Sequence, residues 1–122
     1  MKILLDTHIL IWHLTSNPRL NRIKSGIIED SSNSIFFSIA SLWEIAIKTS
    51  IGKLEIVSPI EFLVPPEISI LNITLSDIAA IETLPFHHRD PFDRMIIAQA
   101  MTHNLPIMTD DNKFKYYDTT II

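Results

Sequence analysis

The chain has 122 residues, a length suited to one hydrophobic core, and we expect residues 1–122 to form a single domain. It contains no cysteine, which excludes disulfides, thiolate metal sites and cysteine nucleophiles and fits a reducing compartment such as the cytoplasm. Fourteen acidic residues against ten Lys and Arg give a net charge of −4, so the chain lacks a general basic surface for nucleic acid.

Hydrophobic residues make up 47 % of the chain, a high share for a small domain with much surface per unit volume. We therefore expect part of the apolar surface to face a partner, either a second copy or another protein. The longest apolar run, from Ile35 to Ile47, is interrupted by Ser38, Ser41 and Glu44, so no membrane-spanning helix is predicted.

The first half of the chain alternates short apolar runs with helical patterns. Polar residues such as Asp6 interrupt the apolar N-terminal stretch, which predicts a buried strand and a helix rather than a signal peptide. In the second predicted helix, Leu20, Ile23, Ile27 and Ile28 are expected to face inward. The elements predicted here are a strand at Ile3–Leu5, a helix that opens at Ile9–Leu14, a helix at Arg19–Glu29, a strand at Ser34–Phe37 and a helix from Ala40 to about Ile51, which stops at Gly52.

The second half continues this alternation, which predicts an α/β fold around a mainly parallel central sheet. In such sheets the functional crevice lies beyond the carboxyl ends of the strands. Only two glycines occur, which excludes a glycine-rich phosphate-binding loop. The elements predicted here are a short helix or turn within Pro59–Pro66, a strand at Ile68–Leu71, helices at Ser76–Leu84 and Pro91–His103, a strand at Leu105–Met108 and an edge strand within Thr119–Ile122.

Two aspartates, Asp6 and Asp111, directly follow predicted strands, which should place them at the same edge of the sheet. The structural alternative for Asp6 is the capping of the helix that follows it. The structural alternative for Asp111 is a polar turn, a role that one of the adjacent pair Asp110 and Asp111 is expected to have. The spacing favours Asp111 as the functional member of that pair.

Two further acids lie in predicted helices. Glu44 precedes Lys48 by one turn, so a solvated ion pair would explain both residues, but the neighbours of Glu44 are strongly apolar. Asp90 before Pro91 has the form of an N-cap residue followed by proline at the first helical position. Capping explains Asp90 better than Asp93, so we assign the structural role to Asp90 and the functional role to Asp93.

Several carboxylates at one crevice would repel one another and raise their pKa values unless a cation neutralised them. Oxygen ligands without thiolates select Mg²⁺ or Mn²⁺ over Zn²⁺. The histidines offer no competing zinc site, because His87 and His88 are adjacent and cannot easily aim at one ion. The remaining three, His8, His13 and His103, show no ligand spacing.

Four segments, in order along nearly the whole chain, resemble PIN-domain proteins and, among them, the VapC-like toxin ribonucleases of type II toxin–antitoxin pairs. Each segment alone is unspecific, but their order and the chain length together are specific. The region Val57–Leu75 adds little to the resemblance. The segments are Leu4–His8, Ser41–Ile45, His88–Arg94 with Ile97–Ala100, and Leu105–Asp111.

The resemblance implies a PIN-like three-layer α/β/α sandwich and endonucleolytic cleavage of RNA. It also implies a homodimer and a cognate antitoxin that inserts a segment across the active groove. The family's metal-binding and catalytic acids fall here at Asp6, Glu44, Asp93 and Asp111, and the neighbouring Asp90 leaves the third ligand ambiguous.

The expected reaction is hydrolysis of an RNA phosphodiester with bound Mg²⁺ or Mn²⁺. Thr7, Ser41 and Thr109 are expected to orient water or phosphate. Bound cations would reverse the local charge of the pocket. Basic side chains would then hold the RNA backbone, and the candidates are Lys48 and Arg94, with Arg89, Lys113 and Lys115.

Two other functions are compatible with an α/β chain of this length. A magnesium-binding phospho-receiver would need an acid pair after the first strand, where only Asp6 stands, and Glu44 lies within a helix. A non-catalytic PIN-fold interaction module would not need all four acids. The RNA target, the number of metal ions and the dimer interface stay open at this stage.

Overall fold

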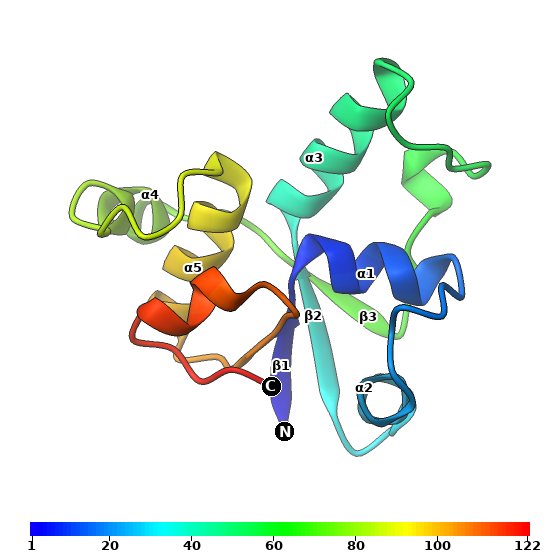
Figure 1. Cartoon of the computed structure of the whole chain (residues 1–122), viewed down its shortest axis with the longest axis horizontal. Coiled ribbons are helices and arrows are strands. Elements are labelled where there is room, and N and C mark those ends of the chain that lie inside the picture. The colour runs from blue at the N-terminus through cyan, green and yellow to red at the C-terminus, as the bar shows by residue number, and fades with distance from the viewer.

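The computed structural model describes the whole chain, Met1–Ile122, around a four-stranded central sheet (Figure 1). All neighbouring strands are parallel, and Leu4 aligns with Phe36 on one side and with Ile107 on the other. The strands are β1 (Lys2–Leu5), β2 (Ser34–Ser38), β3 (Ile68–Leu71) and β4 (Ile107–Met108), in the spatial order β3-β2-β1-β4. The chain thus moves outward from β1 to β3 and returns to the other side of β1 for β4.

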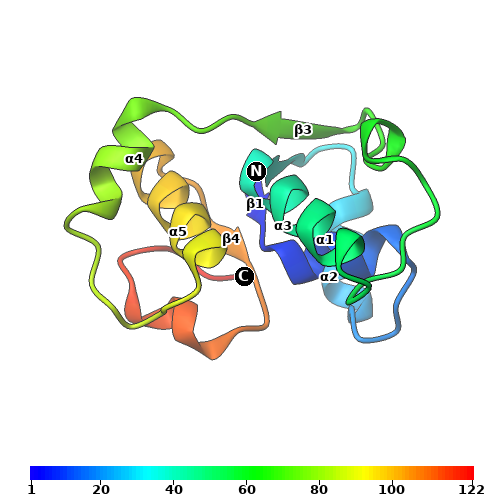
Figure 2. The same cartoon turned by 90° about the horizontal axis from the view of Figure 1, so that it is seen from above.

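Helices cover both faces of the sheet. Figure 2 shows α4 and α5 on one side and α1 and α2 on the other, which gives the predicted three-layer α/β/α arrangement. Every helix falls short of the length and apolarity that crossing a bilayer would require. The helices are α1 (Thr7–Leu14), α2 (Arg22–Glu29), α3 (Ile39–Ser50), α4 (Leu75–Ile81) and α5 (Pro91–His103), with 3₁₀ helices η1 (Ile60–Phe62) and η2 (Asn112–Tyr116).

The hydrophobic interior consists of two clusters, one on each face of the sheet. Successive side chains of a strand point to opposite faces, so Ile3 and Leu5 belong to one cluster and Leu4 to the other. The first cluster takes in residues of α1, α2 and α3, and the second takes in α5 and η2. A strand buried on both faces reads as a continuous apolar run, which is why β1 could be predicted from three residues.

Local capping sets the bounds of α5. The side chain of Asp90 accepts a hydrogen bond from the backbone N–H of Asp93 (2.9 Å), and Pro91 occupies the first turn, as predicted. The helix ends at Asn104, whose φ of 52° lies in the left-handed region that asparagine tolerates. These signals fix the first turn of α5, and with it the position of Asp93.

Some predicted elements differ in extent. α2 begins only at Arg22, because Asn21 caps it, and Ile23 is 77 % exposed rather than inward-facing. β4 has two residues, and the tail contributes a single parallel bridge from Ile121 to Ile107 instead of an edge strand. These differences lie at element ends and at the sheet edge, where few apolar contacts define the structure.

The two-cluster core predicts unequal effects of two truncations on the same helix. Ile97→Ala, at a fully buried position of α5, is expected to lower the free energy of unfolding by about 2–5 kcal/mol, because it removes buried apolar atoms and leaves a cavity. Met101→Ala, at a 40 % exposed position, serves as the control and should change it by about 0.5 kcal/mol. Urea denaturation measures both, and equal losses would contradict the burial described.

Candidate functional site

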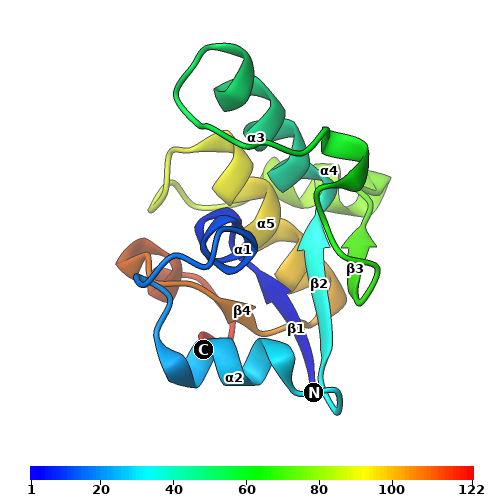
Figure 3. The same ribbon diagram turned by 90° about the vertical axis from the view of Figure 1, so that its right-hand side faces the viewer.

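The strand order creates a switch point beside β1, because the chain leaves β1 towards β2 and later returns to its other side as β4. Ligands bind α/β sheets at such points, beyond the carboxyl ends of the strands. Figure 3 shows β1, β2 and β3 pointing in the same direction, and in Figure 1 the starts of α1, α3 and α5 group at that end. Asp6 follows β1 here and Thr109 follows β4, and the Thr109 hydroxyl donates a hydrogen bond to Asp6 Oδ2 (2.7 Å).

Asp6 occupies the N-cap position of α1 but makes no side-chain hydrogen bond of capping geometry, so capping does not account for the burial of this side chain. Its side chain is buried, and its second oxygen, Oδ1, has no hydrogen-bond partner. Burial is the main cause that raises the pKa of Asp6, and the nearby Asp111 charge raises it further. Asp6 therefore presents an unsatisfied carboxylate oxygen inside the protein.

Glu44 projects from α3 and is only 3 % exposed, so it is not part of a solvated polar stripe. Lys48 Nζ donates to Glu44 Oε2 (2.7 Å), whereas Glu44 Oε1 is buried without a partner. The hydrogen bond to Glu44 is the main cause that raises the pKa of Lys48. Lys48 thus holds one oxygen of this carboxylate and leaves the other free.

Asp93 connects the acids to one another. One of its carboxylate oxygens lies within 4.8 Å of ligand atoms of Glu44 and Asp90, and one lies within 4.8 Å of ligand atoms of His88 and Asp111. Burial, followed by the negative charges of the surrounding carboxylates, raises the pKa of Asp93 to about 8. The first of those charges is that of Asp6, and Glu44 and Asp111 are also among them, so the other three predicted acids all influence Asp93.

Asp111 lies at the start of η2, and its side chain is 34 % exposed. Burial opposes its ionisation, but the backbone N–H of Lys113 and the ring of His88 outweigh that effect and hold the pKa of Asp111 below its usual value. His88 Nε2 lies 2.8 Å from Asp111 Oδ2 and 3.0 Å from Asp93 Oδ2. The pKa of Asp111 is therefore lowered, whereas that of the neighbouring Asp93 is raised.

The three predicted hydroxyl residues are buried and bonded within the protein. The hydroxyls of Thr7 and Ser41 lie 2.8 Å apart and join α1 to α3. Thr109 accepts the backbone N–H of Asp111 (3.0 Å) while it donates to Asp6. These groups hold the elements that carry the acids, a different role from the contact with water or phosphate that the sequence suggested.

Arg94 also differs from its predicted role as an RNA contact. Its side chain is buried, and its guanidinium donates to the backbone carbonyls of Pro85 (2.8 Å), Leu84 (3.0 Å) and His88 (3.2 Å). Five donors on one planar group suit such a convergence of carbonyls. Arg94 therefore fixes the loop before α5 and is not free to meet a substrate.

Two residues near the acids were not identified from the sequence. His88 was set aside as a ligand because it adjoins His87, yet its ring reaches two acids. Lys24 Nζ donates to the carbonyl of Thr109 (2.9 Å) and pairs with Asp110, 86 residues away. Asp110 therefore has the structural role expected of one member of that pair. No local pattern signals contacts between residues so far apart in the chain.

The residues fit a hard divalent cation. Asp6 Oδ1 and Glu44 Oε1 are buried oxygens without partners, and the other donors near Asp93 are carboxylate oxygens and one imidazole. Unpaired buried carboxylates are costly unless a cation or a proton neutralises them. Oxygen-rich sets of this kind suit Mg²⁺ or Mn²⁺.

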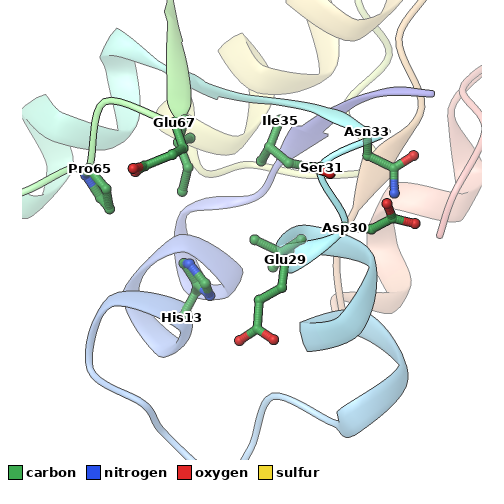
Figure 4. Close-up of a pocket in the computed structure, with 10 residues that line it drawn as sticks. His13, Glu29, Asp30, Ser31, Asn33, Ile35, Pro65 and Glu67 are labelled. Atoms are coloured by element: carbon green, nitrogen blue, oxygen red, sulfur yellow. The ribbon is translucent and has the colours of Figure 1, made fainter.

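A separate hollow of about 430 Å³ lies at the other end of the sheet, around the starts of β2 and β3. Figure 4 shows His13, Glu29 and Glu67 among its lining residues, which come from α1, α2 and the loop before β3. None of the four acids lines it. The acidic edge, by which we mean the end of the sheet that carries Asp6, Glu44, Asp93 and Asp111, is therefore distinct from this hollow.

Comparisons with known proteins agree with this architecture. The profile of the PIN domain family matches residues 3–119, and no curated protein matches the sequence. A chain of VapBC2 from Rickettsia felis, solved with a promoter DNA fragment, is 17 % identical with a TM-score of 0.74, over 100 % of this chain and 98 % of that chain. A chain of VapBC-1 from nontypeable Haemophilus influenzae is 19 % identical with a TM-score of 0.68, over 100 % of this chain and 97 % of that chain.

A third similar structure is FitAcB from Neisseria gonorrhoeae, at 20 % identity and a TM-score of 0.67, over 98 % of this chain and 96 % of that chain. At these identities the structural likeness concerns the fold. The profile match covers nearly the whole sequence and includes all four acids. The chain therefore belongs to the PIN domain family.

Proposed function

We propose that this protein is a metal-dependent endoribonuclease and the toxin of a toxin–antitoxin pair. The observation that carries the proposal is the meeting of four carboxylates, from four separate segments, at the carboxyl edge of the sheet, with Asp6 Oδ1 and Glu44 Oε1 left unpartnered. Its family and its fold, which resembles chains of VapBC structures, support the same reading.

In the proposed mechanism, Asp6, Glu44, Asp93 and Asp111 would hold the divalent cation. When bound, Mg²⁺ or Mn²⁺ supplies an acidified water as nucleophile and positive charge for the leaving oxygen. The chain's own contribution is to fix the ligands: Thr109 holds one oxygen of Asp6 and Lys48 holds one oxygen of Glu44.

Basic side chains around the acidic edge supply the contact with RNA. The Lys48 side chain is 37 % exposed, and Lys113 and Lys115 are exposed close to Asp111 in the chain. Phosphate contacts by such residues give binding that is independent of sequence and weakens with salt. They reconcile RNA as the substrate with the net charge of −4.

The proposed protein partner is a cognate antitoxin, in line with the VapBC toxin–antitoxin fold, and the proposed compartment is the cytoplasm, where RNA is available. We further propose a homodimer through a mostly hydrophobic hollow of about 640 Å³ between α3, α4 and α5. Trp43 and Phe86 line it and are 62 % and 79 % exposed, an unusual exposure for large aromatic rings.

The catalytic proposal predicts the effect of Asp93→Asn. Cleavage of a fluorescent single-stranded RNA in Mn²⁺ should fall by about 100-fold or more, at least the loss caused by removing one preorganised transition-state interaction. The melting temperature in EDTA should stay the same at neutral pH and rise at about pH 9, where wild-type Asp93 has lost its proton and the substitution removes a buried charge. Asp118→Asn, at an exposed position, is the control and should keep full activity. If the wild type cuts no RNA and neither variant differs from it, a non-catalytic PIN-fold module is the better description.

The raised pKa of Asp93 predicts how stability depends on pH without metal. Because its pKa is about 8 in the folded protein, against 3.8 as the ordinary value, the folded state keeps a proton that the unfolded state has released. This stabilisation is complete below about pH 4 and is lost as the pH rises through about 8. In EDTA the melting temperature should therefore fall from about pH 5 to about pH 9, and Asp93→Asn should flatten the fall.

Added Mn²⁺ should raise the wild-type melting temperature more at about pH 8 than at about pH 5, since the cation competes with the proton for the same carboxylates. Scanning fluorimetry over a pH series measures both effects. A Mn²⁺ effect of equal size at every pH would contradict shared binding of protons and metal.

The dimer proposal predicts the effect of a charge in the hollow. Phe86→Glu should convert the dimer to a monomer, because it replaces an apolar ring of the interface with a charged side chain whose burial opposes association. Ile23→Glu, at a similarly exposed site on α2, should remain dimeric. Sedimentation velocity gives the mass of each, and a dimeric Phe86→Glu would place the interface elsewhere.

A further inference from the structure

His88 contacts two of the four predicted acids, Asp93 and Asp111, although the sequence did not identify it as a site residue. Its side chain is 8 % exposed, with Nε2 placed 2.8 Å from Asp111 Oδ2 and 3.0 Å from Asp93 Oδ2. The Asp111 contact has hydrogen-bond geometry. An imidazole in this place can either ligate a metal through Nε2 or donate a hydrogen bond from Nε2 to the acids.

The other ring nitrogen decides between these two roles. The backbone N–H of Asp90 donates to His88 Nδ1 (3.2 Å). A backbone amide can only donate at its nitrogen, so Nδ1 is the acceptor nitrogen of the ring and Nε2 carries the hydrogen. The Nε2–H group therefore donates to Asp111. Ligation through Nε2 would need the proton moved to Nδ1, where it would face the Asp90 N–H.

The surrounding structure holds the ring of His88 in place. Its backbone N–H donates to the Tyr117 hydroxyl (2.7 Å), and its carbonyl accepts from Arg94 (3.2 Å). The ring meets Phe114 edge-on, with centroids 5.5 Å apart. The hydrogen-bond donor is therefore fixed independently of the carboxylates that it contacts.

Asp111 is the acid that most needs such support, since it is the most exposed of the four. Its Oδ1 accepts the backbone N–H of Lys113 (2.9 Å), and its Oδ2 meets His88. Donors on both oxygens fix the plane of the carboxylate. Without His88, the side chain would keep one anchor and could turn towards solvent.

We propose that His88, which also lies next to Asp93, is a positioning residue that orients Asp111 through its Nε2–H group and is not itself a metal ligand. The proposal rests on the proposed metal-dependent function. Partners of this kind, one shell beyond the metal, commonly contribute about 10- to 100-fold to metal affinity.

The test compares two substitutions of His88. In His88→Gln the side-chain amide extends to about the place of Nε2 and can donate a hydrogen bond there, whereas in His88→Asn the shorter amide reaches only about as far as Nδ1. His87→Asn is the matched control, because His87 is exposed and contacts tyrosine rings rather than the acids. Free Mn²⁺ is quantified by electron paramagnetic resonance, and thermal unfolding confirms that each variant is folded.

We expect His88→Asn to weaken Mn²⁺ binding by about 10- to 100-fold, His88→Gln to recover most of the loss, and His87→Asn to bind like the wild type. A purely structural role would lower the melting temperature of both His88 variants and leave Mn²⁺ affinity of the folded protein unchanged, which would overturn the proposal.

Pulsed electron paramagnetic resonance of Mn²⁺ bound to the wild type separates positioning from ligation. We expect no strong ¹⁴N coupling, and a coupling typical of a bound imidazole that disappears in His88→Asn would overturn the positioning role. Mn²⁺ binding without such coupling and with an unweakened His88→Asn would refute this inference alone. Failure of the wild type to bind Mn²⁺ at all would refute the proposed function as well.

Discussion

The mutual repulsion of buried carboxylates at one edge of the sheet is the constraint to which the surrounding structure responds. Three of the four acids differ in what offsets their charge. Thr109 donates to Asp6, and Lys48 pairs with Glu44. Asp93 has no Lys or Arg partner, and its pKa is raised to about 8, so it keeps a proton at neutral pH. A set of carboxylates that is only partly neutralised is unfavourable as a structural element and favourable as a cation site.

The fold supplies this arrangement through its strand order. Because β2 and β4 flank β1, residues that follow β1 and β4 become neighbours although about one hundred positions separate them. The helix that follows β2 brings Glu44, and the first turn of α5 brings Asp93. Asp6 thus directly follows β1, and Glu44 and Asp93 lie within helices that the core holds, which fixes their geometry more firmly than a loop would.

The sequence predicted those features that depend on local patterns. The continuous apolar run of β1 and the Asp90–Pro91 start of α5 identified the elements, and their flanking acids identified Asp6 and Asp93 as candidates. His88 and Lys24 could not be found in this way, because their contacts join residues 23 and 86 positions apart. Residue type was misleading for Arg94, because a guanidinium can be satisfied by interior carbonyls as well as by phosphate.

The division of the interior into two clusters has a consequence for how the protein is made. Asp6 and Glu44 lie on or beside α1 and α3, which pack on the first cluster. Asp93 and Asp111 lie on or beside α5 and η2, which pack on the second cluster. A ribosome synthesises the first pair long before the second. A nascent chain therefore carries half of the acids until Asp93 emerges with α5, and the fourth, Asp111, follows only after β4, so the complete set arises at the last stage of synthesis.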